Sequence, residues 1–219
     1  HEKVLKAYNV STVFLAREVA DRIEAGTLTW KVFGGTHPKP AGNRIAADMV
    51  ASLLDRAWSR PPVKKAAPHA LPWKPLDIGS YQRGHFLSPA ASANAGWTWH
   101  VPDWKGIPGG FRTHPFGGKK LLTATGPGQE TVLKFKGRAL GAYVLAGPDA
   151  GILEVSIDDG KWQSVNLYHR HSLGLHYPRT VMFATDLKTG PHTAKIRLSK
   201  ASDARSRGTA VRILQFVVN

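Results

Sequence analysis

The chain has 219 residues, 42% of them hydrophobic, and a formal net charge of +15 at pH 7. It contains no cysteine, which excludes disulfides, thiolate metal sites and a cysteine nucleophile. No apolar run approaches the roughly 20 residues that cross a bilayer, and no nucleic-acid reader motif, basic helix or zinc module accompanies the positive charge. We therefore expect neither a membrane nor nucleic acid as partner. The charge favours an acidic polysaccharide, or it simply keeps the surface soluble.

Residues 1–60 are predicted to be mainly helical. His1–Tyr8 fits the end of a helix, and Val10–Leu15 is a short β-prone run that predicts a strand. Ala16–Ala25 spaces its apolar residues as an amphipathic helix does. Pro40–Trp58 has the most regular pattern in the chain, with an apolar stripe on one side and charged residues on the other. This block is therefore expected to contribute helices and one strand.

The rest of the chain predicts a linker and then a β domain. Residues 61–75 contain five prolines and no periodicity, which is typical of an extended linker. Residues 76–219 alternate polar and apolar side chains in short runs, separated by turn sequences such as Asp158-Asp159-Gly160. The clearest of these predicted strands are Thr131–Lys136, Ile152–Asp158 and Thr193–Ser199. Many short strands without intervening helices indicate a β-sandwich or jelly roll.

One short motif in the first block carries a chemical signal. Thr36–Arg44 reads THPKPAGNR and stands directly before the long predicted helix. A histidine on a loop at a helix N-terminus is well placed to face a cleft, and the two prolines stiffen its approach. Taken alone, His37 also fits an ordinary surface loop before a helix-starting proline.

Residues 1–60 as a whole resemble the C-terminal end of SGNH/GDSL hydrolases of the carbohydrate-esterase type. In that family a helix, the last strand, a second helix and an HP-x-x-x-G loop lead into the final helix. The resemblance implies that the block is part of a flavodoxin-like α/β domain. It also implies that His37 is the general base, which takes a proton from a serine nucleophile that attacks an ester carbonyl.

The sequence departs from the family pattern in two ways. The family usually has an aspartate two or three residues before this histidine, where this chain has Gly34 and Gly35. The GDS nucleophile block and the GxND-like oxyanion block do not occur in the 219 residues, and about 60 residues cannot build a five-stranded parallel sheet with its helices. We therefore expect a partial catalytic domain, a missing N-terminal catalytic segment as its partner, and no esterase activity from this chain alone.

The later part of the chain has a resemblance of its own. Gly137–Val165, with Leu173–Thr180 and Leu187–His192, is similar to galactose-binding-like jelly rolls attached to bacterial esterases and glycosidases. This implies an accessory domain of the same SGNH hydrolases at residues 76–219, and a secreted or periplasmic location. The expected fold class is α+β overall: a partial flavodoxin-like α/β segment at residues 1–60, then an antiparallel β-sandwich.

Basic and aromatic side chains gather within twelve positions of the predicted sandwich. They are Tyr168, His169, Arg170, His171, His176, Tyr177 and Arg179. The last six are candidate substrate contacts, because histidine and tyrosine can stack on a sugar and arginine can bind a carboxylate or sulfate with two hydrogen bonds. The alternative is a loop whose polar groups are satisfied internally. The three histidines have no carboxylate alongside and fit no standard zinc spacing, so we expect no metal and no cofactor.

Two further sets of residues have a functional and a structural interpretation. Aromatic residues in a Gly/Pro-rich stretch could form a sugar platform, although such residues are more often core: Trp97, Trp99, Trp104, Phe111 and Phe116. Polar residues of the same stretch could edge the active-site cleft, namely Arg112, Thr113 and His114. Three aspartates could suggest calcium, but turn formation accounts for them better: Asp149, Asp158 and Asp159.

These observations support one leading hypothesis and two alternatives. The leading one is an enzyme component that deacetylates an O-acetylated polysaccharide, which can itself be anionic. The first alternative is a non-catalytic carbohydrate-binding or structural module. The second is a polyanion-binding protein, because residues 61–219 hold 21 basic against 9 acidic residues, a net charge of +12.

Overall fold

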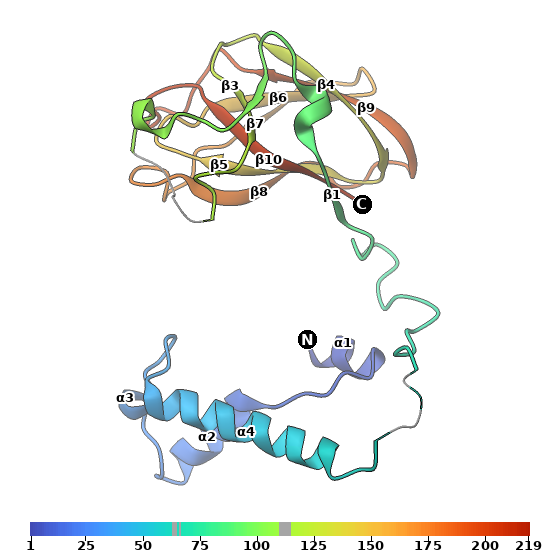
Figure 1. Ribbon diagram of the computed structural model, residues 1–219, viewed down its shortest axis with the longest axis vertical. Coiled ribbons are helices and arrows are strands. Elements are labelled where there is room, and N and C mark those ends of the chain that lie inside the picture. The colour runs from blue at the N-terminus through green and yellow to red at the C-terminus, as the bar shows by residue number, and fades with distance from the viewer. Residues whose placement is uncertain (63–64, 66, 110–114) are drawn as a thin grey trace. The chain divides into compact units, whose positions relative to one another are not determined.

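The computed structural model describes residues 1–62, 65, 67–109 and 115–219. The chain forms two compact units, His1–Ser80 and Tyr81–Asn219 (Figure 1). The first unit is helical and the second is built from antiparallel sheets, which confirms the α+β class with a β-sandwich. The described residues between 61 and 75 lie in no helix or strand, and the boundaries 1–60, 61–75 and 76–219 stay a prediction. None of the described helices combines the length and apolar character that a bilayer crossing requires.

The described part of the first unit forms four helices: α1 (Glu2–Ala7), α2 (Leu15–Glu24), α3 (Trp30–Phe33) and α4 (Pro40–Trp58). Their ends follow local rules. The Thr29 side chain caps α3 by accepting a hydrogen bond from the Val32 amide. Pro40 opens α4, where a fixed φ and a missing N–H are tolerated. The two amphipathic helices predicted by periodicity are confirmed as α2 and α4.

The helices of this unit bury few apolar side chains. Their core consists of Val19, Leu28, Phe33 and Ile45, and α1 has no buried residue. Large apolar side chains are exposed along the unit, among them Phe14, Trp30, Val50, Leu54 and Trp58. Small domains are already marginal when they bury a complete core, so this unit has less apolar burial than a free-standing domain needs.

The prediction of a strand at Val10–Leu15 is wrong. Residues 10–14 lie in no helix or strand, and Leu15 is the first residue of α2. A strand is defined by hydrogen bonds to a neighbouring strand, and the described residues of this unit contain no such neighbour. The run therefore lacks regular structure although its composition favours β structure.

The second unit is a sandwich of two antiparallel sheets. One sheet has the order β2-β3-β10-β5-β8, with β1 also paired to β10; its strands are β1 (His85–Leu87), β2 (Thr98–His100), β3 (Leu121–Ala124), β5 (Leu140–Ala146), β8 (Tyr177–Ala184) and β10 (Val211–Val218). The other has the order β4-β9-β6-β7, with β4 (Glu130–Gly137), β6 (Ile152–Ile157), β7 (Gln163–Asn166) and β9 (Gly190–Leu198). The three strands predicted from alternation are β4, β6 and β9 of this second sheet.

Period-two alternation explains how the sandwich packs. In β4, Leu133 and Phe135 are buried, whereas Lys134 and Lys136 are exposed. The inward side chains of both sheets form one core, whose fully buried members include Trp97, Leu140, Leu153, Ile196 and Phe216. The indole N–H of Trp97 donates a hydrogen bond of 3.1 Å to the Gln129 carbonyl, so Trp97 is a satisfied core residue.

A second, smaller core covers part of the outer face of the larger sheet. Trp104 packs there with Leu121, Leu145 and Leu214. Its indole N–H donates a hydrogen bond of 3.0 Å to the Gly117 carbonyl. The structural interpretation is therefore confirmed for Trp104 as well as for Trp97, and neither is an exposed sugar platform.

Candidate functional site

His37 lies on the loop between α3 and α4, and this loop is held by backbone contacts. The Lys39 amide donates a hydrogen bond of 2.8 Å to the Phe33 carbonyl. Gly42 lets the first turn of α4 approach the end of α3, since a Cβ at that position would lie 2.6 Å from the Phe33 oxygen. The glycine of the HP-x-x-x-G motif thus has a local structural role: it is the residue at which α4 contacts the end of α3.

The two positions where the family has its aspartate adopt left-handed backbone conformations in this chain. Gly34 has a φ of 104° and Gly35 a φ of 72°, which are left-handed conformations that favour glycine. At Gly34 a Cβ would lie 2.5 Å from the Lys39 amide nitrogen. His37 is exposed, and none of the residues that the structure describes forms a hydrogen bond with its ring. This loop therefore presents the imidazole without orienting it.

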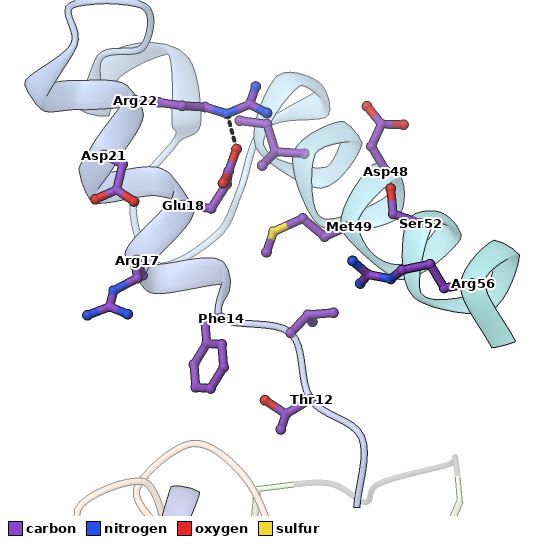
Figure 2. Close-up of a pocket in the computed structure, with 12 residues that line it drawn as sticks. Thr12, Phe14, Arg17, Glu18, Asp21, Arg22, Asp48, Met49, Ser52 and Arg56 are labelled. Carbon is purple, nitrogen blue, oxygen red and sulfur yellow. Dashed lines mark hydrogen bonds and ion pairs between the residues drawn. The ribbon is translucent and has the colours of Figure 1, made fainter.

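A groove of about 430 Å³ lies between α2, α4 and the segment before α2 (Figure 2). Both of its helical walls are charged, and Phe14 and Met49 add apolar surface. On α2, Arg22 Nε donates to Glu18 at 2.7 Å. His37 is not one of the residues that line the groove. The groove therefore lacks the histidine that an esterase site requires.

The sandwich brings three candidate side chains into direct ring contact. The ring of His169 stacks on Tyr177, with centroids 4.4 Å apart and planes 9° from parallel. His171 completes the group at 5.1 Å from His169 and 5.2 Å from Tyr177. Tyr177 begins β8, and both histidines come from the loop before it. The sequence cluster is thus partly a cluster in space.

Hydrogen bonds orient the rings of both histidines. Arg170 Nε donates to His171 Nε2 at 3.3 Å, and the His171 amide donates to His169 Nδ1 at 3.3 Å. Each of these ring nitrogens accepts a hydrogen bond, so the opposite nitrogen of each ring is the one that can donate to a ligand.

Hydrogen bonds of Ser172 and Arg179 fix the loop that carries these rings. Ser172 is fully buried; its hydroxyl donates to the Ala146 carbonyl at 2.8 Å and accepts from the His169 amide at 3.0 Å. Arg179, on β8, donates from Nη1 to the Leu167 carbonyl at 3.4 Å. The side chains therefore stand on a fixed backbone.

The electrostatic environment of this group is positive. Partial burial, followed by the charge of Arg179 and then by His171 and Arg170, holds the pKa of His169 below its usual value. The carboxylate of Asp203, in the same unit, is engaged by Arg205, which binds both of its oxygens at 2.9 Å. Among the residues that the structure describes, no carboxylate forms an ion pair with Arg170 or Arg179.

His176 does not belong to this surface, contrary to its place in the sequence cluster. It is fully buried, and its ring meets Trp104 edge-on with centroids 5.1 Å apart. Its Nε2 donates to the Pro108 carbonyl at 3.2 Å. A Cβ at Gly147 would lie 2.2 Å from the ring, so glycine makes the space for it. His176 is a packing residue and is not accessible to a substrate in this structure.

Sequence reasoning missed a second surface, on the four-stranded sheet. The Arg197 guanidinium lies 4.0 Å from the Trp162 ring centroid and donates to Glu154 Oε2 at 2.6 Å. Arg197 and Glu154 face each other across β9 and β6 and line a hollow of about 560 Å³. Strand register brings them together, and one sequence without its pairing does not give that register.

The other candidates have simpler outcomes. Asp158 and Asp159 have φ values of 51° and 56° in the turn after β6, which supports the turn interpretation. Trp99 is partly buried against the main core, and Phe116 packs edge-on against Tyr143 at 6.4 Å. The remaining candidates lie outside the described residues: Phe111, Arg112, Thr113 and His114.

Comparisons with solved structures show which known proteins share this fold. No family model and no curated protein matches the sequence. A crystal structure of a two-domain esterase (CEX) active on acetylated mannans, co-crystallized with mannopentaose, matches all of this chain and 57% of its own, with 14% identity and a TM-score of 0.68. A second structure of a two-domain esterase with that description matches all of this chain and 58% of its own, with 14% identity and a TM-score of 0.67. The chain therefore shares the fold of somewhat more than half of each of these esterase chains.

Proposed function

We propose that this chain is the C-terminal part of a serine carbohydrate esterase of the SGNH type, which removes acetyl groups from an O-acetylated polysaccharide. The observation that carries the proposal is the placement of His37. It stands exposed on an HP-x-x-x-G loop at the start of α4, in a chain whose whole length shares a fold with a two-domain esterase. That esterase is described as active on acetylated mannans, which supports an acetylated polysaccharide as substrate here. The proposed location, secreted or periplasmic, follows from the family resemblance of the sequence.

His37 would act as general base in two balanced steps. It takes the proton of a serine hydroxyl as the serine oxygen attacks the acetyl carbonyl, and it gives that proton to the departing sugar oxygen. A water molecule then attacks the acyl-enzyme. His37 takes the proton of this water and returns it to the serine oxygen as acetate leaves. The serine and the groups that bind the oxyanion are assigned to a catalytic segment outside these 219 residues.

The first unit supports such a missing segment. Four of its described residues form its core, while Phe14 on the segment before α2 is 49% exposed and Trp58 at the end of α4 is 73% exposed. Apolar surface of this extent is normally covered in a finished domain. The β-prone run at residues 10–14 would gain hydrogen bonds if a neighbouring strand lay beside it. The missing segment is proposed to supply that strand.

Hydrolysis of p-nitrophenyl acetate tests the proposal. The 219-residue chain should show no turnover above buffer, because a base without its nucleophile gives no acyl-enzyme. A longer polypeptide that carries the serine segment should be active, and His37→Ala should lower its kcat by about 10³-fold or more. His85→Ala, at an exposed histidine of the sandwich, is the matched control and should retain full activity. If the 219-residue chain hydrolyses the ester and His37→Ala abolishes this activity, the proposal that the serine lies on a segment outside these residues is refuted.

The alternative function is a carbohydrate- or polyanion-binding module without catalysis. The group at His169, with two arginines that form no ion pair among the described residues, is the observation that favours it. An inactive long polypeptide that still binds polysaccharide would support this alternative over the esterase.

A further inference from the structure

The sandwich carries a cationic group of side chains that the esterase chemistry does not use. We define the His169 cluster as His169, Arg170, His171, Tyr177 and Arg179. We infer that this cluster binds an acidic sugar unit, one that bears a carboxylate or a sulfate. The inference deepens the carbohydrate side of the proposed function and rests on it only for the ligand being a polysaccharide.

The first argument is uncompensated charge. Arg179 is half-buried, and one of its five N–H groups meets the Leu167 carbonyl. Five carboxylates of the described sandwich residues form ion pairs elsewhere, namely Asp149, Glu154, Asp158, Asp159 and Asp203. Arg170 is exposed, and its charge and that of Arg179 both act on the ring of His169. Like charges that lie close together repel one another, and an anion between them relieves that repulsion. An acidic ligand would supply that anion.

The second argument is shape. The rings of His169 and Tyr177 lie 4.4 Å apart and almost parallel, and the neighbouring ring of His171 is tilted by about 55° against Tyr177. Together they form an aromatic wall next to the arginines. A sugar ring can pack its C–H face on such a wall while its acidic group meets a guanidinium with two parallel hydrogen bonds.

The third argument is preorganisation. The buried Ser172 fixes the loop through the Ala146 carbonyl and the His169 amide. The hydrogen bonds within the cluster use His169 Nδ1 and His171 Nε2 as acceptors, which leaves His169 Nε2 and His171 Nδ1 as the ring nitrogens that can donate to a ligand. A ligand therefore meets the guanidinium N–H groups and these ring nitrogens as donors, and the Tyr177 hydroxyl can donate or accept. This favours acceptor-rich anions and costs little ordering of the loop.

Titration calorimetry on the 219-residue chain at physiological salt tests the inference with three probes. Trigalacturonate carries carboxylates, a heparin tetrasaccharide carries sulfates as well, and mannopentaose is neutral. We expect binding of at least one acidic probe and affinity about tenfold or more lower for mannopentaose, since charge-assisted hydrogen bonds are the strong ones. Binding of trigalacturonate assigns the carboxylate, and binding of the heparin probe alone assigns the sulfate.

Paired variants separate a site from general charge attraction. Arg170→Gln and Tyr177→Ala should each weaken the acidic probe about tenfold, because one removes a guanidinium and the other the stacked ring. Lys134→Gln removes the same charge from the exposed face of β4 and should change the affinity less than about twofold. Arg170 is exposed, and an unchanged melting temperature of Arg170→Gln shows that the fold is intact.

Three outcomes would overturn the inference: equal binding of mannopentaose, no binding of either acidic probe, or an equal loss in Lys134→Gln. These outcomes are independent of the esterase assay. If no acidic sugar binds but the longer polypeptide is active, the His169 cluster proposal is refuted and the esterase proposal stands. If an acidic sugar binds but no esterase activity is found, the esterase proposal is refuted and the His169 cluster proposal stands.

Discussion

His192 shows how a single residue of the sandwich sets a pH dependence. Its Nδ1 lies 2.6 Å from Asp158 Oδ2, and its Nε2 lies 2.7 Å from the Lys188 carbonyl oxygen. Because both partners can accept, this geometry favours the cationic imidazole, which has a proton on each ring nitrogen. Asp158 is the largest cause that raises the pKa of His192, and His192 is the largest cause that lowers the pKa of Asp158.

The sign of the effect follows from these directions. The raised pKa of His192 contributes stability that is full below its unfolded value, about 6.5, and is lost as the pH rises through the folded value. The lowered pKa of Asp158 contributes stability that is lost as the pH falls below about 3.9. The pair is therefore most stabilising between these two values.

We predict that His192→Gln costs more free energy of unfolding at pH 5.5 than at pH 9. Urea unfolding of wild type and variant at the two pH values measures the difference. His85→Gln, at an exposed histidine that forms no ion pair with a described carboxylate, should cost little at either pH. A cost of His192→Gln that stays constant or grows towards pH 9 would contradict this account.

At the scale of elements, one buried ion pair ties β10 to the turn between β5 and β6. Arg212 Nη1 and Nη2 donate to the two oxygens of Asp149 at 2.7 and 2.6 Å. The residues are 4% and 7% exposed. The Ala210 amide also donates to the Asp149 carbonyl at 2.7 Å, so side chain and backbone fix the turn together.

Removing one partner of this pair should be costly. Arg212→Met and Asp149→Asn each leave a buried charge without its counterpart, and each should lower the free energy of unfolding by about 3–5 kcal/mol. The double variant should lower the free energy of unfolding by less than the sum of the two single variants, because it leaves no buried charge unpaired. Urea denaturation measures all three. Arg44→Met, at an exposed helix pair with Asp48, is the control and should change little.

The sequence predicts best those elements that bury one face and expose the other. Apolar and polar residues recur with the period of a strand in β4, β6 and β9 and with the period of a helix in α2 and α4. In contrast, β10 is apolar at nearly every position. Ile213 belongs to the core between the sheets and Leu214 to the core under Trp104, so no alternation marks this strand. The Val10–Leu15 prediction failed for a different reason, since pairing and not composition makes a strand.

Across the whole molecule, spacing along the chain predicted the candidate site in part. The ring contacts among His169, His171 and Tyr177 follow from a tight loop that leads into β8. His176 stands one residue before that strand, yet its side chain enters the core beside Trp104. A sequence shows that histidines are close, but the direction of each side chain depends on the turn. The cross-strand group at Trp162 escaped prediction because it depends on register.

The two units should differ in stability, since their cores differ in size. The sandwich encloses one large core, whereas four apolar side chains are buried among the described residues of the helical unit. Local stability follows buried apolar contact, so we predict that amides of α2 and α4 exchange with deuterium at least about 100-fold faster than those of β5 and β10. Hydrogen exchange with mass spectrometry on the 219-residue chain compares both units in one sample, and the sandwich serves as the internal reference. If the proposed serine segment covers Phe14 and its exposed neighbours, the same helix amides should become protected in a longer polypeptide that carries it. Equal protection of helices and strands in the short chain would show that the helical unit needs no such cover.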